Sequence, residues 1–304
     1  MLQRSNVDRA YGSALAMLSA LFLPPVTSAA AQATLTYPSL DADLAGGKAT
    51  PVSAWLYRPA GAGPFPAVVA PHGCGGLVES TGKSRGALTA RHADWAKRLS
   101  TAGYVVLLPD SFGSRGIAEI CTVKERDAIQ RARPRDAYGA LVWLQAQPFI
   151  QPDRIAVLGW SNGGGTVIRS VDAKSEARPE SLPHGDFRAA VAFYPGCPDP
   201  KRSKTGREWR PSAPLLILVG EADDWTPATP CRNLAEAANK RGDDVTLQLY
   251  PGAYHGFDTP NPGVRVRTGL ATARDGTAHV GNDPAARADS LVRVPEFLRR
   301  HLGG

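Results

Sequence analysis

Gly159-Trp160-Ser161-Asn162-Gly163 is the stretch of the sequence that decides the fold. It follows the apolar run RIAVL at 154–158, typical of a buried strand, and precedes residues 164–168, whose spacing suits a helix packed on a sheet. In this turn from strand to helix, the glycines leave room for a tight bend that holds the serine hydroxyl above the sheet. The context therefore predicts that Ser161 is a nucleophile. Because the chain has 31 glycines, the pattern alone also fits an ordinary turn.

Two later stretches supply candidate partners for Ser161. The apolar run 215–219 leads into Gly220-Glu221-Ala222-Asp223-Asp224, and the run 245–250 leads into a loop that contains His255. Each candidate follows the carboxyl end of a predicted strand, where open α/β sheets place their active sites. The chain order serine, aspartate, histidine is the order of α/β-hydrolases. The residues alone leave Asp223 and Asp224 open as the acid.

These stretches together resemble the dienelactone hydrolase family of α/β-hydrolases, in its serine-bearing branch. The similarity covers roughly residues 50–302. The chain departs from the family pattern at one informative position. Dienelactone hydrolase itself has a cysteine as the nucleophile in this pattern, whereas this chain has Ser161. The resemblance therefore fits best the relatives that hydrolyse ordinary carboxylic esters. The matching stretches are His72-Gly73-Cys74-Gly75-Gly76, Pro109-Asp110-Ser111-Phe112 with Arg115-Gly116, 159–164, 220–227 and His255-Gly256-Phe257.

The resemblance implies a role for each residue of a catalytic triad. Ser161 would attack the ester carbonyl, and His255 would be the general base. The family pattern Gly-x-x-Asp…Pro matches Gly220 and Asp223, so Asp223 is the expected acid and Asp224 a solvated or helix-capping neighbour.

The resemblance also implies an oxyanion hole, made by the backbone N–H groups of Asn162 and Cys74. His72 comes too early in the chain to be the base and is expected to anchor the oxyanion loop.

Several side chains near these loops are candidates for substrate contacts. Arginines near the site can pair with a substrate carboxylate in this family, which makes Arg115 a candidate; the alternative is an ion pair with Asp110 or another structural acid. Four aromatic residues near these loops are expected to contribute to a pocket for the acyl or alcohol group: Phe112, Trp160, Trp225 and Tyr254. Some of the four are expected to belong to the core instead.

The rest of the chain predicts one α/β domain, and the resemblance implies that it is an α/β-hydrolase domain, over residues 34–304. Apolar runs at 53–57, 66–70, 104–108 and 189–194 predict further strands, and helical spacing occurs at 91–101, 135–147, 230–241 and 284–302. Such alternation predicts a mostly parallel sheet with helices on both faces. Residues 170–186 are too few for a large lid domain. The long stretch 259–282 either rims the site or forms a loop.

Residues 1–31 have the pattern of a signal peptide. Two arginines precede the apolar segment 14–23, and small residues follow it, so we expect cleavage after Ala31 or Ala33. The alternative is an N-terminal helix of the fold. Export predicts a periplasmic or secreted protein.

The four cysteines predict two disulfides. Loops that follow neighbouring strands meet above the carboxyl edge of the sheet, which favours the pairs Cys74–Cys121 and Cys197–Cys231. Four free thiols are the alternative. No C-x-x-C pair occurs and the histidines do not cluster with cysteines, so neither a metal site nor a cofactor is expected.

The net charge of +7 comes from scattered basic residues rather than from a basic stripe interleaved with aromatics. This distribution argues against a nucleic-acid partner, and no stable membrane insertion is expected. The expected partner is a small-molecule or polymeric ester, and the oligomeric state stays open. Two other functions remain as alternatives: a peptidase or acyltransferase that uses the same triad, and a non-catalytic polymer-binding relative.

Overall fold

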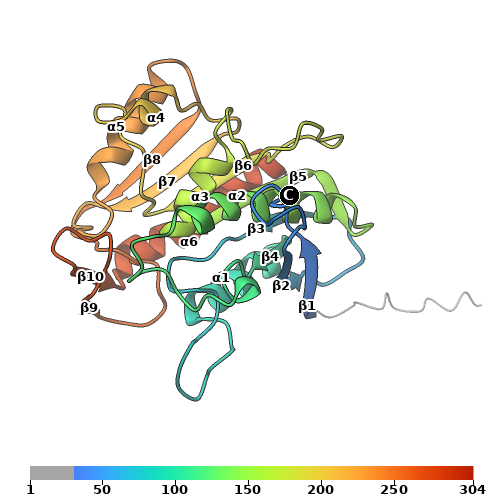
Figure 1. The fold of residues 1–304 in the computed structure, drawn as a ribbon, viewed down its shortest axis with the longest axis horizontal. Helices are drawn as coiled ribbons and strands as arrows, with labels where there is room; N and C mark the ends of the chain where they lie inside the picture. The colour runs from blue at the N-terminus through green and yellow to red at the C-terminus, as the bar shows by residue number, and fades with distance from the viewer. Residues whose placement is uncertain (1–30, 304) are drawn as a thin grey trace, which may run out of the picture.

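An eight-stranded sheet forms the centre of the molecule, with strand order β1-β2-β4-β3-β5-β6-β7-β8 (Figure 1). The computed structural model describes residues 31–303. The first two strands pair antiparallel, and β2 is antiparallel to β4; every pairing from β4 to β8 is parallel. The strands are β1 (Ala31–Pro38), β2 (Pro51–Arg58), β3 (Phe65–Val69), β4 (Val105–Pro109), β5 (Ile150–Trp160), β6 (Ala189–Phe193), β7 (Leu215–Gly220) and β8 (Val245–Tyr250).

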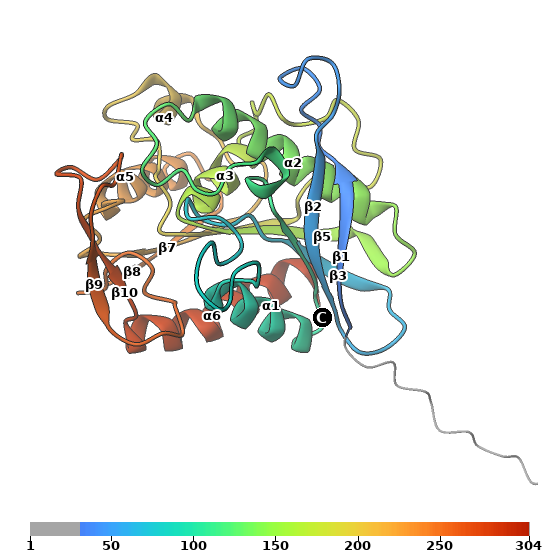
Figure 2. The ribbon, with the colours of Figure 1, turned by 60° about the horizontal axis from the view of Figure 1, so that its bottom comes forward.

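Helices cover both faces of this sheet, as the sequence predicts. The helices α1 (Ala90–Thr101) and α6 (Pro284–Leu302) share a core with one face; α2 (Asp127–Gln145), α3 (Asn162–Ser170) and α5 (Ala228–Asn239) share a core with the other (Figure 2). Strands β4, β6 and β7 have every residue buried, which explains their nearly continuous aliphatic sequences. Two short helical segments, η1 (Gly113–Arg115) and α4 (Lys204–Glu208), lie in the connections.

The helix α2 begins eight residues before the predicted start at Arg135. The prediction rests on apolar spacing that is clear only from Arg135 onward, and Pro134 lacks an N–H and disfavours helical geometry in the residue before it. In the structure the helix runs through Pro134, and its first turns bury Ile129 and Ala132. Tertiary packing of these apolar side chains therefore outweighs the local preference.

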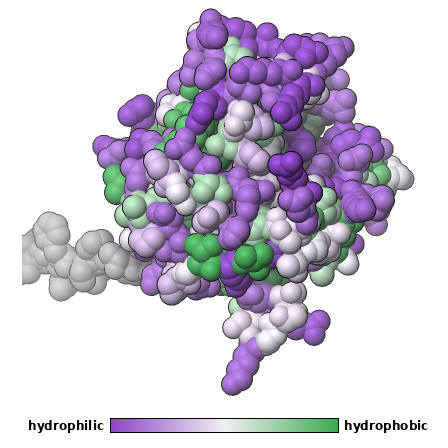
Figure 3. Space-filling view, turned by 90° about the vertical axis from the view of Figure 1, so that its left-hand side faces the viewer, coloured by the Kyte–Doolittle hydropathy of each residue, from purple (hydrophilic) through white to green (hydrophobic). Residues whose placement is uncertain are grey.

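The stretch 259–282 contains a second, small sheet that the sequence pattern does not predict. Strands β9 (Val264–Arg267) and β10 (Ala278–Gly281) pair antiparallel, and a bridge joins His255 to Val280. The face of the molecule that carries them is mostly hydrophilic (Figure 3). Among residues 31–303, no helix combines the length and apolar character that a membrane crossing requires.

Strand β1 is also absent from the predicted elements. The predicted signal peptide lies almost entirely outside the described residues, which begin with β1 at Ala31. Cleavage after Ala31 keeps seven of the eight residues of β1, whereas cleavage after Ala33 keeps five.

Both predicted disulfides are present, Cys74–Cys121 and Cys197–Cys231. The first joins the loop after β3 to the loop after η1, and the second joins the loop after β6 to α5.

The Cys197→Ser/Cys231→Ser double variant should lower the free energy of unfolding by about 2–4 kcal/mol, because the bridge joins residues 34 positions apart and so restricts the unfolded chain. Urea denaturation of the wild-type protein and of the double variant, both without reductant, measures this difference. Equal urea midpoints and equal slopes for the two proteins would contradict the prediction.

Candidate active site

Ser161 sits at a strained turn between β5 and α3. Its φ of 53° is positive, which is uncommon for a residue with a side chain. A Cβ on Gly159 would overlap the carbonyl oxygen of Gly163, and a Cβ on Gly163 would overlap that of Pro71. Only glycines therefore permit so close an approach of backbones. The Ser161 N–H donates to the Phe193 carbonyl at 2.9 Å, which helps to hold the strained conformation.

The side chains of Ser161, His255 and Asp223 form a continuous hydrogen-bonded chain. His255 Nε2 is 2.9 Å from Ser161 Oγ, and His255 Nδ1 is 2.8 Å from Asp223 Oδ2. The three residues follow β5, β8 and β7, whose carboxyl ends lie at one edge of the sheet. The histidine and aspartate side chains are almost completely buried, at 4% and 0% exposed. This arrangement allows the imidazole to accept the serine proton while the carboxylate holds the ring.

Backbone and side-chain donors fix the Asp223 carboxylate. Its Oδ1 accepts hydrogen bonds from the backbone N–H groups of Trp225 and Thr226, at 2.9 and 2.8 Å, and the Thr226 hydroxyl is 3.0 Å from Oδ2. The neighbouring Asp224 points elsewhere, since its Oδ2 is 2.7 Å from His279 Nδ1 at the surface. Of the two candidate acids, the geometry therefore favours Asp223.

The loop after β3 passes directly over Ser161. A Cβ on Gly73 would lie 3.7 Å from Ser161 Cβ, so the next residue, Cys74, is close to the serine. Neither the Cys74 N–H nor the Asn162 N–H donates a hydrogen bond within residues 31–303. Asn162 is the first residue of α3, where backbone N–H groups have no partner in the helix. Both groups remain free to bind an oxygen that gains negative charge.

Arg133 joins this loop to the elbow, and the sequence analysis does not identify it. Its buried guanidinium donates to the Asn162 side-chain oxygen and to the His72 carbonyl, and lies over the Phe112 ring at 4.9 Å from the centroid. Burial lowers the pKa of Arg133 to about 9. Nothing in the run QRARPR separates this arginine from Arg131, which is exposed, or from Arg135, which pairs with Asp43, so no local signal reveals it.

Asp258 is a second residue that the sequence analysis misses. It is fully buried and accepts hydrogen bonds from the indole N–H groups of Trp95 and Trp160 and from the Tyr194 hydroxyl. Arg91 pairs with it at 3.1 Å. The Tyr194 ring packs on the His255 ring at 4.6 Å between centroids, so this network helps to position the histidine.

His72 and His92 form a buried, neutral pair beneath the loop. Burial lowers the pKa of His72 well below its ordinary 6.5 and that of His92 to about 3. His72 Nδ1 is 2.7 Å from the Gly73 carbonyl, so it donates there and holds the loop, as expected for an anchor.

This pair makes stability sensitive to acid. The unfolded histidines bind protons near pH 6.5 but the native ones do not, so the stabilisation is complete above pH 6.5 and declines as the pH falls toward 3. Each group contributes a slope of up to about 1.4 kcal/mol per pH unit. Urea midpoints measured between pH 7.5 and 5 should fall, and His92→Gln should reduce that fall. A midpoint independent of pH, or an equal slope in the variant, would contradict the expectation.

The structure corrects three of the four aromatic substrate contacts. Phe112 and Trp160 are 1% exposed and belong to the core, and Tyr254 stacks on His279. These three residues are close to the site in sequence, but the rings of Phe112 and Trp160 pack in the core and the ring of Tyr254 packs against His279. Trp225 does line the space around Ser161.

The prediction that Arg115 contacts the substrate is also wrong. Its guanidinium pairs with the buried carboxylates of Asp41 and Asp136, each at 2.7 Å. The expected alternative, an ion pair with a structural acid, is therefore what the structure contains, although the acids differ from Asp110. Two carboxylates already compensate this cation.

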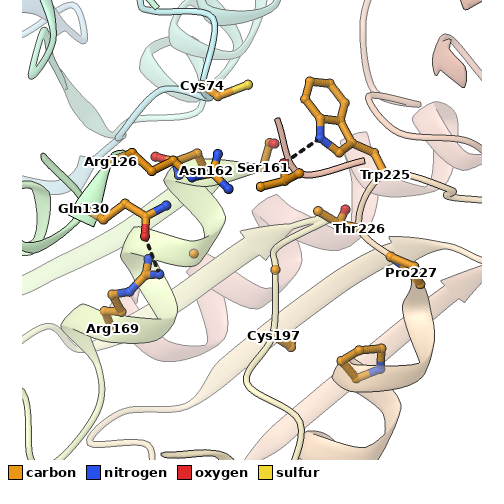
Figure 4. Close-up of a pocket in the computed structure, with 14 residues that line it drawn as sticks. Cys74, Arg126, Gln130, Ser161, Asn162, Arg169, Cys197, Trp225, Thr226 and Pro227 are labelled. Carbon is orange, nitrogen blue, oxygen red and sulfur yellow. Dashed lines mark hydrogen bonds between the residues drawn. The ribbon is translucent and has the colours of Figure 1, made fainter. Parts of the chain in front are cut away.

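Two cavities meet at Ser161. The α2–α3 cavity, of about 350 Å³, is drawn in Figure 4 and includes Arg126, Gln130, Arg169 and Trp225. The β9 cavity, of about 590 Å³, includes His255, Trp225, Arg265 and Arg267. The stretch 259–282 thus rims the site through β9. Within the described residues, no cluster of three or more His, Cys, Asp or Glu side chains could hold a metal ion.

A family model described as the dienelactone hydrolase family matches residues 52–302. Solved structures share the fold. A dienelactone hydrolase-like promiscuous phosphotriesterase, P91, from metagenomic libraries has a TM-score of 0.62 at 19% identity, with 90% of this chain and 100% of that chain covered. A thermophilic esterase from Thermogutta terrifontis, with propionate bound, has a TM-score of 0.58 at 21% identity, over 88% and 93% of the chains. Dipeptidyl peptidase 4 from Porphyromonas gingivalis has a TM-score of 0.59 at 18% identity, over 90% of this chain but 36% of that one.

Proposed function

This chain belongs to the dienelactone hydrolase family, a family of hydrolases with the α/β-hydrolase fold, and from that premise we propose that it cleaves carboxylic esters through a serine nucleophile. The observation that carries the proposal is the hydrogen-bonded chain from Ser161 Oγ through His255 to Asp223, with distances of 2.9 and 2.8 Å. A serine hydroxyl is a weak nucleophile unless a neighbouring base removes its proton. His255 stands at the correct distance to do so.

In the first half of the reaction, Ser161 Oγ attacks the ester carbonyl carbon and its proton passes to His255 Nε2. The carbonyl oxygen becomes an oxyanion, which the free N–H groups of Cys74 and Asn162 stabilise. Asp223 stabilises the resulting imidazolium through Nδ1–H. The C–O bond to the alcohol then breaks, His255 returns the proton to the leaving oxygen, and an acyl-serine remains.

In the second half, water replaces the alcohol. His255 accepts a proton from the water as its oxygen attacks the acyl carbon, and the same N–H groups bind the new oxyanion. Collapse breaks the bond to Ser161 Oγ, which recovers its proton from His255, and the carboxylic acid leaves. Arg133 contributes by holding the oxyanion loop and the elbow in register.

A panel of chromogenic substrates tests the proposal. We expect the purified protein to hydrolyse 4-nitrophenyl esters, to leave peptide 4-nitroanilides largely intact, and to keep its activity in EDTA. Faster cleavage of peptides than of esters would support the peptidase alternative, and absence of any turnover would support a binding protein. Loss of activity in EDTA would contradict a serine mechanism that needs no metal.

The proposal includes export, which the two disulfides support because such bonds persist in oxidising compartments. The mature chain is expected to begin at Gln32 or Thr34. Intact-mass measurement of protein from a periplasmic or culture fraction checks this, and a chain that still begins at Met1 would contradict export.

A further inference from the structure

The loop that carries one of the two oxyanion donors has a single side chain. Residues 73–76 are Gly-Cys-Gly-Gly, so Cys74 alone in this run has atoms beyond the backbone with which to hold its place. Cys74 lines both cavities together with Ser161 (Figure 4). Glycine restricts the backbone least of all residues. The position of the Cys74 N–H therefore depends on what Cys74 itself binds.

Cys74 is attached to one neighbouring segment at two points. Its Sγ forms the disulfide with Cys121, and its carbonyl accepts a hydrogen bond from the Ile120 N–H at 2.8 Å. Within the loop, the Gly76 N–H donates to the Gly73 carbonyl at a longer 3.3 Å. The disulfide is thus the covalent tie that decides where this donor lies relative to the serine.

The other end of the bridge is firmly held. Cys121 is fully buried, and its carbonyl accepts a hydrogen bond from the Ala271 N–H at 2.9 Å. Its own N–H donates to the Glu119 carboxylate. Cys121 also belongs to a core cluster that includes Ile129 and Leu270. The bridge therefore ties a loop rich in glycine to a packed part of the protein.

The position of an oxyanion donor has a large effect on rate. Such donors accelerate a reaction because they already point at the place where negative charge develops, and loss of one lowers kcat by about 10²- to 10³-fold. A misplacement of about 1 Å at a reacting centre can cost as much as 10²-fold. A donor that is loosened but still present should therefore lose part of this factor.

We infer that the Cys74–Cys121 disulfide is a positioning element for catalysis, which holds the Cys74 N–H against the developing oxyanion, so that the protein is fully active only while this bridge is oxidised. The inference rests on the proposed serine mechanism, in which that N–H is a donor. A dithiol that reduces the bridge lowers the activity. Its thiolate attacks Cys74 Sγ, and the mixed disulfide then closes to the cyclic disulfide of the reagent. The reagent loses two electrons and two protons, and Cys74 and Cys121 become thiols.

The two bridges of this chain provide a matched pair of variants. Cys121→Ala and Cys231→Ala each break one bridge at a fully buried position that lines neither cavity. The bridged residues are 47 and 34 positions apart, so the two variants should lose similar amounts of stability. Only the first variant frees a loop that carries an oxyanion donor.

Steady-state hydrolysis of 4-nitrophenyl acetate compares the two variants with the wild type. In Cys121→Ala, kcat should fall by about 10- to 100-fold while KM stays within about threefold, because the oxyanion exists in the transition state and not in the bound ester. In Cys231→Ala, kcat should stay within about threefold of the wild type, since that bridge holds no donor.

A transition-state analogue separates lost positioning from lost folding. A trifluoromethyl ketone forms an adduct with Ser161 that carries an oxyanion, so its inhibition constant for Cys121→Ala should rise in parallel with the fall in kcat/KM. Partial unfolding would lower kcat but leave the inhibition constant of the folded fraction unchanged. A loss of kcat without weaker inhibition, a loss confined to KM, or equal losses in both variants would overturn the inference.

A measurement on the wild-type protein keeps the inference testable if Cys121→Ala does not fold. During limited reduction by dithiothreitol, the activity should fall in parallel with the appearance of alkylatable Cys74 and Cys121, and it should return on reoxidation. Full activity after reduction of this bridge, or a loss that follows the Cys197–Cys231 bridge instead, would overturn the inference. The proposed function would survive both results, because the oxidised protein would still hydrolyse the ester. If the oxidised wild type cleaves no ester, the proposed function itself fails.

Discussion

Ser161→Ala should lower kcat for ester hydrolysis by about 10⁴- to 10⁶-fold, with the remainder near the background rate. The substitution removes only the hydroxyl that His255 Nε2 contacts at 2.9 Å. Alanine has the same Cβ as serine, so the strained turn and the approach of its flanking glycines are preserved. The loss would therefore be chemical rather than structural, and the thermal midpoint should stay close to that of the wild type.

His255→Ala should lower kcat almost as much, and combining it with Ser161→Ala should add little. Members of a triad act as a unit, because the base is useless without the nucleophile and the nucleophile without the base. Ser84→Ala, in an exposed loop, is the matched control for loss of a serine hydroxyl. Substantial ester hydrolysis by Ser161→Ala would contradict the assignment of the nucleophile.

Asp223→Asn should lower kcat by about 10⁴-fold, while Asp224→Asn should change it little. The amide of asparagine can donate to His255 Nδ1, which would place the remaining ring proton on Nε2, facing Ser161. The base could then not accept the serine proton. Asp224 lies at the surface, where it contacts His279, and it makes no hydrogen bond to the imidazole of His255. Steady-state kinetics of the two variants make the comparison, with folding checked by circular dichroism.

The opposite result, a large loss in Asp224→Asn and a small one in Asp223→Asn, would contradict the register of the 220–227 loop. The serine and the histidine would keep their roles in that case. The two variants are closely matched, because each replaces one carboxylate by an amide at adjacent positions.

The elements that the sequence predicts well are those with strong local signals. Strand β7 is a continuous aliphatic run, and the elbow needs Gly159 and Gly163 for a steric reason that is visible in the five-residue pattern. Ser161, Asp223 and His255 each follow a strand of the parallel part of the sheet, so their proximity could be expected from parallel topology alone. Both cysteine pairs follow from the same argument, since the loops that carry them meet above one edge of the sheet.

The elements that escape prediction depend on distant partners. Arg115 and Arg133 are both arginines near the site, yet the first pairs with Asp41 and Asp136, and the second donates to the His72 carbonyl in the loop after β3. The distance in sequence from Ser161 cannot predict which partners each of these two arginines binds. The same holds for Trp160, which adjoins Ser161 but turns its indole toward Asp258 in the core. Side-chain direction at a tight turn is decided by packing and by long-range hydrogen bonds.

Labelling with a fluorophosphonate probe tests the central claim most directly. The reagent phosphonylates a serine only when a base activates it and an oxyanion hole binds the phosphonyl oxygen, so it reports on the whole arrangement. We predict one phosphonyl group per chain by intact mass, located at Ser161 by peptide mapping, with esterase activity falling in parallel and no label on Ser161→Ala. An unlabelled chain, or a label elsewhere while activity persists, would contradict the assignment of Ser161, His255 and Asp223 as a serine hydrolase triad.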